Sequence, residues 1–537
     1  MILREFMQAI AQEQNGGDAR SLGVARDDDV RQQIKLLAGV LAILAFFAFG
    51  MVAPQWYFAV IVAGLVLAML ARWPMVGLVA MAVSAPFINV EVHWGNMHMP
   101  VVDVVALAMV VAVGIRFFLT RGAARSLDSL RSLGMTGWAR GMTKAGAPIF
   151  FFAAFLLVAA LSLVNAVDGF AGLKYLLRPV LFFAIAYLAV PVVVLGAEAG
   201  AEAKLLARSL ASGSYRSLAS GVHAMLWTFI FVGLAVTAMG LVSLPGQEDV
   251  AVRRVLPIAI FGMYPLGTNQ NQIAEVLLVT LPVMALLRER ARSLRVRRAW
   301  LIAMAPVAFT LLATLSRAGW IALAVEVAVV LLLLVRPTKR RLLTGAFVAS
   351  FFVLPFLGSF VRLAAVEAGQ SANENRWLLT TASYEMWQAH PWIGNGIGTF
   401  VPLLSQNRRY VAKFGEALDS HGVVQKLLVE IGLLGTALFG LFWVAMLRSF
   451  LAALRLRSGN MDRGAALWLA LFLGTSVFQL FGTSYFLGRF WLPIGVGLAA
   501  LGLRNREMAT NPTKTRSPDF ARDDGTFCSI RRAFVVS

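Results

Sequence analysis

Two arginines of this 537-residue chain stand at positions suited to binding phosphate. Arg317 lies in the turn TLSRAGW between two long apolar runs, and Arg376 follows in the polar stretch ENRWLL. A guanidinium stays charged at physiological pH and can donate two parallel hydrogen bonds to one phosphate group. The pair therefore predicts a diphosphate site, although each arginine alone is equally compatible with contact to lipid headgroups.

Two further basic residues extend this predicted cluster. Lys174 and Arg178 lie in GLKYLLRPV at the start of another apolar run. A spacing of four residues places both on one face of a helix, one turn apart. We expect them to contribute to binding of the same anionic substrate.

His421, in LDSHGVVQKLL, is the candidate for proton transfer. It directly precedes an apolar run, and an imidazole can hold or release a proton near neutral pH. A helix cap or a headgroup contact is the alternative role for a histidine at this position. His390 precedes a proline and is interpreted as the end of a helix.

The sequence predicts no metal site and no cofactor. His93 and His98 are separated by five residues in a glycine-containing loop, which is not a ligand spacing. Cys528 is the single cysteine of the chain, so no internal disulfide and no thiol-based redox pair can form.

Three carboxylates, Glu275, Glu326 and Glu430, interrupt apolar runs. Glu326 is a candidate proton relay or a paired structural carboxylate, and interhelical polar pairing is the simpler explanation for all three. The sequence GNGIGTF looks like a phosphate-binding loop, but it follows a predicted helix and a proline. We interpret it as a turn.

The composition indicates that the surrounding solvent is a bilayer. Hydrophobic residues make up 59% of the chain and charged residues 14%, whereas soluble proteins carry about 25% charged residues. The net charge of +20 would suggest nucleic acid in a soluble protein. Here we expect the basic residues to lie mainly in cytoplasmic loops, so no nucleic-acid partner is predicted.

A membrane span needs about 20 apolar residues, which predicts about twelve to fourteen transmembrane helices. The candidate runs are 36–53, 57–71, 75–90, 100–119, 147–166, 173–195, 222–244, 270–287, 299–316, 318–335, 342–361, 422–447, 464–482 and 485–503. The runs 57–71 and 75–90 are short enough to form a re-entrant hairpin instead. No repeat and no broken helix is evident from the sequence.

Basic residues set the predicted orientation. Most of the 48 lysines and arginines fall on one side when the N-terminus is placed in the cytoplasm, including those of Arg288–Arg298. Both termini are then cytoplasmic, and the long loop 362–421 lies outside. Residues 373–390 of that loop have helical spacing of apolar side chains and predict an interfacial helix that ends at Pro391.

In this arrangement the chain resembles the O-antigen ligase and O-antigen polymerase superfamily of polytopic membrane glycosyltransferases. The resemblance is carried by 269–435, where NQNQIAEVLL, TLSRAGW, NENRW, HPWIGNGIGTF and SHGVVQKLLVEIGLLG follow in order. It implies that Arg317, Arg376 and His421 are catalytic. Asn271 is assigned to substrate binding together with Lys174 and Arg178.

The resemblance implies a C-type glycosyltransferase-like, all-α polytopic membrane protein with one large periplasmic loop. The expected organisation is a cytoplasmic segment, N-terminal transmembrane helices, a ligase-like catalytic region that includes the loop, and a disordered cytoplasmic tail. Their bounds are 1–35, 36–261, 262–503 and 504–537. The expected location is the bacterial inner membrane.

The implied reaction moves a glycan from an undecaprenyl diphosphate carrier to an acceptor hydroxyl, with inversion and without a metal. Where such proteins often have an asparagine and an aromatic residue after the histidine, this chain has Gly422 and Val424. The resemblance thus leaves three acceptors open. They are lipid A core for a ligase, the growing glycan for a polymerase, and a protein. A lipid-linked glycan flippase or exporter is the alternative from another class.

Overall fold

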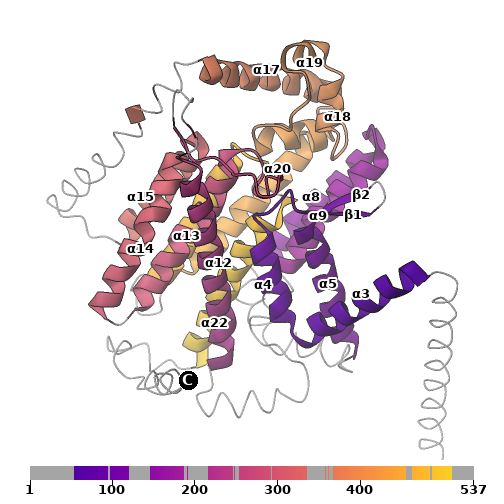
Figure 1. Ribbon diagram of the computed structural model, residues 1–537. Coiled ribbons are helices and arrows are strands. Elements are labelled where there is room, and N and C mark those ends of the chain that lie inside the picture. Colours follow the sequence, from indigo (N-terminus) through magenta and orange to yellow (C-terminus); the bar gives the residue numbers. More distant parts are fainter. Residues whose placement is uncertain are drawn as a thin grey trace, which may run out of the picture. The chain divides into compact units, whose positions relative to one another are not determined.

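The structure is a computed structural model, shown in Figure 1, and it is built almost wholly of helices. The residues that it describes are 54–94, 97–119, 146–186, 190, 216–245, 247, 253–291, 293–334, 357–358, 361, 367–454, 462–483 and 486–510. The chain divides into two compact units, residues 1–69 and residues 70–537. The described part of the first unit is the beginning of one helix, α3 (Pro54–Arg72).

The second unit contains the remaining described helices and one small hairpin. The helices are α4 (Pro74–Ser84), α5 (Val101–Leu119), α8 (Gly146–Ser162), α9 (Gly169–Ala184), α12 (Arg216–Val242), α13 (Gln270–Arg290), α14 (Leu294–Ala313), α15 (Arg317–Leu334), α17 (Glu367–Ala389), α18 (Phe400–Ser405), α19 (Arg408–Phe414), α20 (Val423–Ala452), α21 (Arg463–Gln479) and α22 (Gly488–Thr510), with a short 3-10 helix η3 (Leu163–Asn165) after α8. The hairpin pairs β1 (Glu91–Trp94) with β2 (Met97–Pro100) in antiparallel register.

The all-α polytopic class is confirmed. Within the described residues, six helices are long and apolar enough to cross a membrane, or seven if Val62–Arg72 and Pro74–Ser84 form one bent span. The six are Ala147–Asn165, Gly221–Val242, Gln270–Arg290, Leu294–Ala313, Arg317–Leu334 and Val423–Ala452. The other predicted spans coincide at least in part with further helices, except that 36–53 and nearly all of 342–361 lie outside the described residues.

One predicted span is too long. The run 75–90 forms only the 11-residue helix α4, which ends at Ser84 before a turn at Pro86 and the hairpin. At 1.5 Å per residue, such a helix covers only about half of a bilayer core. Hydropathy alone did not reveal that the apolar residues after Ser84 belong to a turn.

Polar side chains set where the long helices begin. Asn269 caps α13 by accepting a hydrogen bond from the Asn271 amide, and Ser293 caps α14 through the Val296 amide. Such caps satisfy amide groups that have no partner within the helix. Because α14 begins at Leu294, the basic stretch 288–298 is mostly helical and only a three-residue connection separates α13 from α14.

Helix α13 is the most enclosed of the candidate spans, and it packs against α12, α14, α15 and α21. Helices α15 and α21 also pack closely. Gly474 of α21 lies directly against Glu326 of α15, where a Cβ would overlap the carboxylate side chain. Small residues at helix contacts allow this approach.

The loop between α15 and α20 has a core of its own. Leu379 of α17, Phe400 of α18 and Tyr410 of α19 are fully buried together with Val429 of α20. In Figure 1, α17, α18 and α19 lie next to the beginning of α20. The helix predicted over 373–390 is confirmed as part of α17, and it ends at Ala389 before Pro391.

Candidate functional site

Helix α20 is broken at Gly432. Residues 391–396, which precede the helix in the sequence, form hydrogen bonds with its backbone on both sides of the break. Gly432 has φ 70° and ψ −171°, which interrupts the helical hydrogen-bond pattern. The amides of Asn395 and Gly396 donate to the carbonyls of Val429 and Glu430, each at 2.9 Å. In the opposite direction, the amides of Leu433 and Leu434 donate to the carbonyls of Pro391 and Trp392 at 2.9 and 3.1 Å.

Glycines make this close approach possible. A Cβ on Gly394 would overlap the backbone of Glu430, and one on Gly432 would overlap the backbone of Trp392. Both residues also have positive φ, which other residues rarely adopt. The interpretation of GNGIGTF as a turn is confirmed, and the break in α20 is a feature that was not evident from the sequence. The break matters because backbone groups exposed to lipid would be costly.

Arg317 is the first residue of α15, and its position is set by Ser316. The Ser316 hydroxyl accepts a hydrogen bond from the Gly319 amide at 3.1 Å, which caps the helix. The same hydroxyl donates to Oδ1 of Asn271 at 2.7 Å. Asn271, predicted to bind substrate, therefore lies at the turn that carries Arg317 and ties this turn to the beginning of α13.

Arg376 and His421 are brought together by a contact between α17 and α20. Nε2 of Gln425 donates to the Thr380 hydroxyl at 2.7 Å, and that hydroxyl donates to the Arg376 carbonyl at 2.8 Å. Arg376 precedes Thr380 by four residues, and His421 precedes Gln425 by four residues. The two predicted residues are thus on neighbouring segments at one end of the contact.

Electrostatics place Arg317 in the same group. Desolvation lowers the pKa of Arg376, and the positive charge of Arg317 lowers it further. Burial lowers the pKa of His421, Arg376 acts in the same direction, and Asp419 opposes them. Arg317 and His421 are half-buried, whereas Arg376 is exposed. The charge of Arg317 thus acts on Arg376 and that of Arg376 on His421, although the three predicted catalytic residues come from three different segments.

Arg178 and Lys174 have other surroundings. The Arg178 guanidinium is paired with the Asp103 carboxylate of α5 at 2.6 Å, and both side chains are largely buried. Arg178 Cζ also lies 5.3 Å from the centre of the Phe486 ring. Lys174 is exposed one turn earlier on α9. The Asp103 carboxylate already neutralises the Arg178 guanidinium. Arg178 can therefore bind an anionic substrate, as predicted, only by sharing this charge with Asp103 or by giving up the ion pair.

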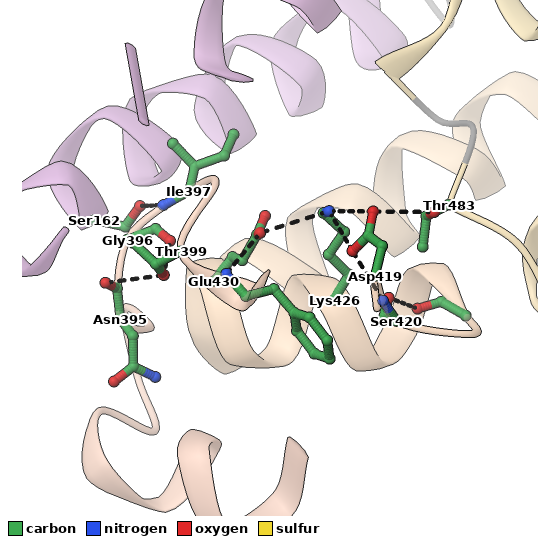
Figure 2. A network of polar contacts seen from close by, with 12 residues as sticks. Ser162, Asn395, Gly396, Ile397, Thr399, Asp419, Ser420, Lys426, Glu430 and Thr483 are labelled. Carbon is green, nitrogen blue, oxygen red and sulfur yellow. Dashed lines mark hydrogen bonds and ion pairs between the residues drawn. The ribbon is translucent and has the colours of Figure 1, made fainter. Parts of the chain in front are cut away.

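The sequence analysis missed a buried ionic cluster at the beginning of α20, shown in Figure 2. Lys426 Nζ lies 2.7 Å from both carboxylate oxygens of Asp419 and 3.7 Å from Oε1 of Glu430. Lys426 and Glu430 are 1% and 0% exposed, so both charges have left water. We call Asp419, Lys426 and Glu430 the α20 cluster. A lysine in the first turn of an apolar run was the available signal.

The α20 cluster also joins the loop to α9 and to the segment before α22. Oε1 of Glu430 accepts from the Phe400 amide at 3.3 Å, and the Thr483 hydroxyl contacts Oδ2 of Asp419 at 3.4 Å. Lys426 Nζ lies 5.3 Å from the Tyr175 ring centre and 5.2 Å from that of Phe486. Such cation–π contacts partly replace lost hydration of the ammonium group.

A second buried cluster lies between α13, α21 and α22. Glu275 pairs with Arg489 at 2.8 Å and accepts a hydrogen bond from Gln479 at 3.1 Å. We call these three residues the α13 cluster. The expected interhelical pairing is confirmed for Glu275. Glu326 is buried, and its Oε1 has no hydrogen-bond partner among the described residues.

Within the described part of the chain, no group of three His, Cys, Asp or Glu residues is arranged to hold a metal ion. His93 and His98 face each other as Cα partners across the hairpin β1–β2. The described residues thus form a polytopic helical membrane protein in which a loop and two helices gather two arginines and a histidine.

Comparison with known families agrees with this arrangement. Residues 273–440 match the model of the family described as O-Antigen ligase, and the match extends from α13 into α20. This region of the chain therefore resembles a domain of the O-antigen ligase superfamily. The matched region contains Arg317, Arg376 and His421. A search of curated proteins finds no match to the chain.

Proposed function

We propose that this protein is an O-antigen ligase-type glycosyltransferase that acts on a lipid-linked donor at the periplasmic face of the bacterial inner membrane. The convergence of Arg317, Arg376 and His421 within the family region carries the proposal. The donor is an undecaprenyl diphosphate-linked glycan. The acceptor is a hydroxyl of lipid A core, with the growing glycan or a protein as the alternative acceptors.

The two arginines bind the diphosphate in this proposal. Arginine offers paired donors to phosphate oxygens and keeps its charge as negative charge grows on the leaving group. The mutual repulsion of Arg317 and Arg376 is relieved when a dianionic group lies between them. This arrangement stabilises the leaving diphosphate without a metal ion.

His421 accepts the proton of the acceptor hydroxyl. Its lowered pKa keeps the imidazole neutral, which is the form that can accept a proton. The acceptor oxygen then attacks the anomeric carbon opposite the diphosphate, the carbon–oxygen bond to the diphosphate breaks, and the configuration inverts. The products are the glycosylated acceptor and undecaprenyl diphosphate.

The test is transfer by the purified protein in detergent with an undecaprenyl diphosphate-linked glycan and no ion gradient. We expect product with lipid A core, glycan or protein as acceptor, and loss of product in Arg376→Lys. Arg408→Lys is the matched control because Arg408 is an exposed arginine of α19 in the same loop. No transfer to any of the three acceptors would contradict the proposal.

A flippase or exporter is the second candidate, and the break in α20 favours it. Transporters often place substrate and ion sites at discontinuous helices, and here charged groups lie next to the break at Gly432. Donor movement across vesicles that depends on a gradient, without any new glycosidic bond, would support this function instead.

Topology provides a separate test. We expect single cysteines placed in 362–421 to react with an impermeant maleimide from outside intact spheroplasts, and one at Ser293, between α13 and α14, to remain unlabelled until lysis. Cys528 is first replaced by serine. Labelling of position 293 from outside would reverse the proposed orientation.

A further inference from the structure

The segment that carries His421 is anchored by a carboxylate two residues earlier. Oδ1 of Asp419 accepts a hydrogen bond from the Ser420 amide at 2.8 Å, and the Ser420 hydroxyl donates to the Gly422 carbonyl at 3.1 Å. Lys426 holds the same carboxylate through both of its oxygens. His421 therefore lies within a short turn whose two sides are both fixed.

Charged residues are not needed merely to anchor the turn that carries His421. A buried ion pair costs much of its attraction in lost hydration, and apolar residues of similar size often stabilise a fold equally well. Here one ammonium group, that of Lys426, faces two carboxylates. If Asp419 and Glu430 are both ionised, the cluster carries excess negative charge close to the segment that bears His421.

We propose that Asp419, held in place by Lys426, is the positioning residue of His421. It fixes the turn that carries the imidazole and balances the arginine charge around it. The functional importance of this role rests on the proposed function of His421 as a proton acceptor. The structural part of the proposal can be tested without substrate.

Two charged groups act directly on His421: Arg376 of α17 and Asp419 of its own segment. Arg317 of α15 acts on Arg376, and Lys426 of α20 is paired with Asp419. Asp419 is the carboxylate that raises the pKa of His421 against burial and Arg376. Without Asp419, the imidazole should bind its proton less tightly.

The probe is diethyl pyrocarbonate, which modifies a histidine side chain in its neutral form and not in its protonated form. The rate of modification of His421 is followed by peptide mass spectrometry in purified full-length protein between about pH 4.5 and 8. For Asp419→Asn we expect the midpoint to move to lower pH. A shift of half a pH unit makes His421 react about threefold faster one unit below the wild-type midpoint.

Asp419→Asn should fold, because its side chain can still accept from the Ser420 amide and Lys426 keeps Glu430 as a partner. Asp419→Ser is a second neutral variant with the same expected shift. Glu374→Gln is the matched control, since it removes one carboxylate from an ion pair with Lys413 that is exposed in the same loop. The exposed His390 serves as an internal reference in every sample.

A folded Asp419→Asn or Asp419→Ser protein whose His421 reacts with the wild-type pH dependence overturns the inference. So does a shift of the same size in Glu374→Gln. If the wild type transfers no glycan while His421 still shifts, the proposed function fails and the positioning role stands. If the wild type transfers glycan and no shift occurs, the positioning role fails and the proposed function stands.

Discussion

The α20 cluster and the α13 cluster both bury a cation with a carboxylate, but their connections differ. In the α13 cluster Glu275 pairs with Arg489, and the neutral Gln479 also donates to Glu275 across the contact between helices. In the α20 cluster Lys426 meets two carboxylates, and one of them belongs to the loop that carries His421. A buried pair between helices connects those helices. In our proposal, a cluster that includes a carboxylate of the loop also adjusts the chemistry of the neighbouring histidine.

Replacement of His421, whose segment is held by the α20 cluster, should have the largest effect on turnover. For His421→Ala we expect turnover to fall about 10²–10⁴-fold, the range for losing a general base, with donor affinity unchanged because the arginines provide it. Turnover and donor binding are measured separately. Near-normal turnover would exclude His421 from the mechanism.

The pH profile sharpens the same prediction. Because burial and Arg376 lower the pKa of His421, the imidazole stays neutral to a lower pH than the usual value of about 6.5. Activity should therefore be constant above the lowered pKa and fall about tenfold per pH unit below it. If His421 instead binds diphosphate as a cation, activity rises on acidification and His421→Ala binds donor more weakly.

Breaking the α13 cluster should affect stability and leave chemistry unchanged. Glu275→Gln leaves the Arg489 charge buried without its carboxylate, which costs about 3–5 kcal/mol. We expect less protein in the membrane and a lower unfolding temperature in detergent, with normal turnover per folded molecule. A changed pH profile in this variant would remove the distinction between the two clusters.

Arg317→Lys should lose most activity, by about 10–10²-fold, because a point charge replaces a paired donor. The effect should exceed that of replacing any arginine in the 288–298 stretch. Product formation at equal expression is the measurement. Wild-type product in Arg317→Lys would show that Arg317 does not bind the diphosphate through paired hydrogen bonds.

The smallest effect is expected where α17 meets α20. Thr380→Val removes the hydrogen bond from Gln425, worth about 1 kcal/mol, and keeps the side-chain shape. We expect a loss of activity of about threefold to fivefold, because Arg376 and His421 are held together less firmly. Thr381→Val is the control, since its hydroxyl donates only within α17 in the described contacts.

The order of motifs along the chain predicted Arg317, Arg376 and His421, because the motifs of Arg317 and His421 stand where spans begin and that of Arg376 stands in the long loop between them. Spacing could not predict the α20 cluster. Lys426 follows Asp419 by seven residues across the start of a helix, and Phe486 is far along the chain. Only the folded structure places these residues around one ammonium group.

The break in α20 was also beyond the reach of hydropathy. Gly432 lies in LLVEIGLLG, and a glycine among apolar residues is common in membrane helices. The break depends on residues 391–396, which reach the helix through backbone hydrogen bonds. Backbone contacts leave little trace in the residue types apart from the glycines that permit them.

The filled break has a consequence for biogenesis. Helix α20 does not satisfy all of its own backbone groups, so it is not an autonomous membrane span in the way that α15 is. Its missing partners lie earlier in the chain and are synthesised before it. The loop therefore has to dock on α20 before every backbone group at the break has a partner. Completion of the helix is thus coupled to formation of the site.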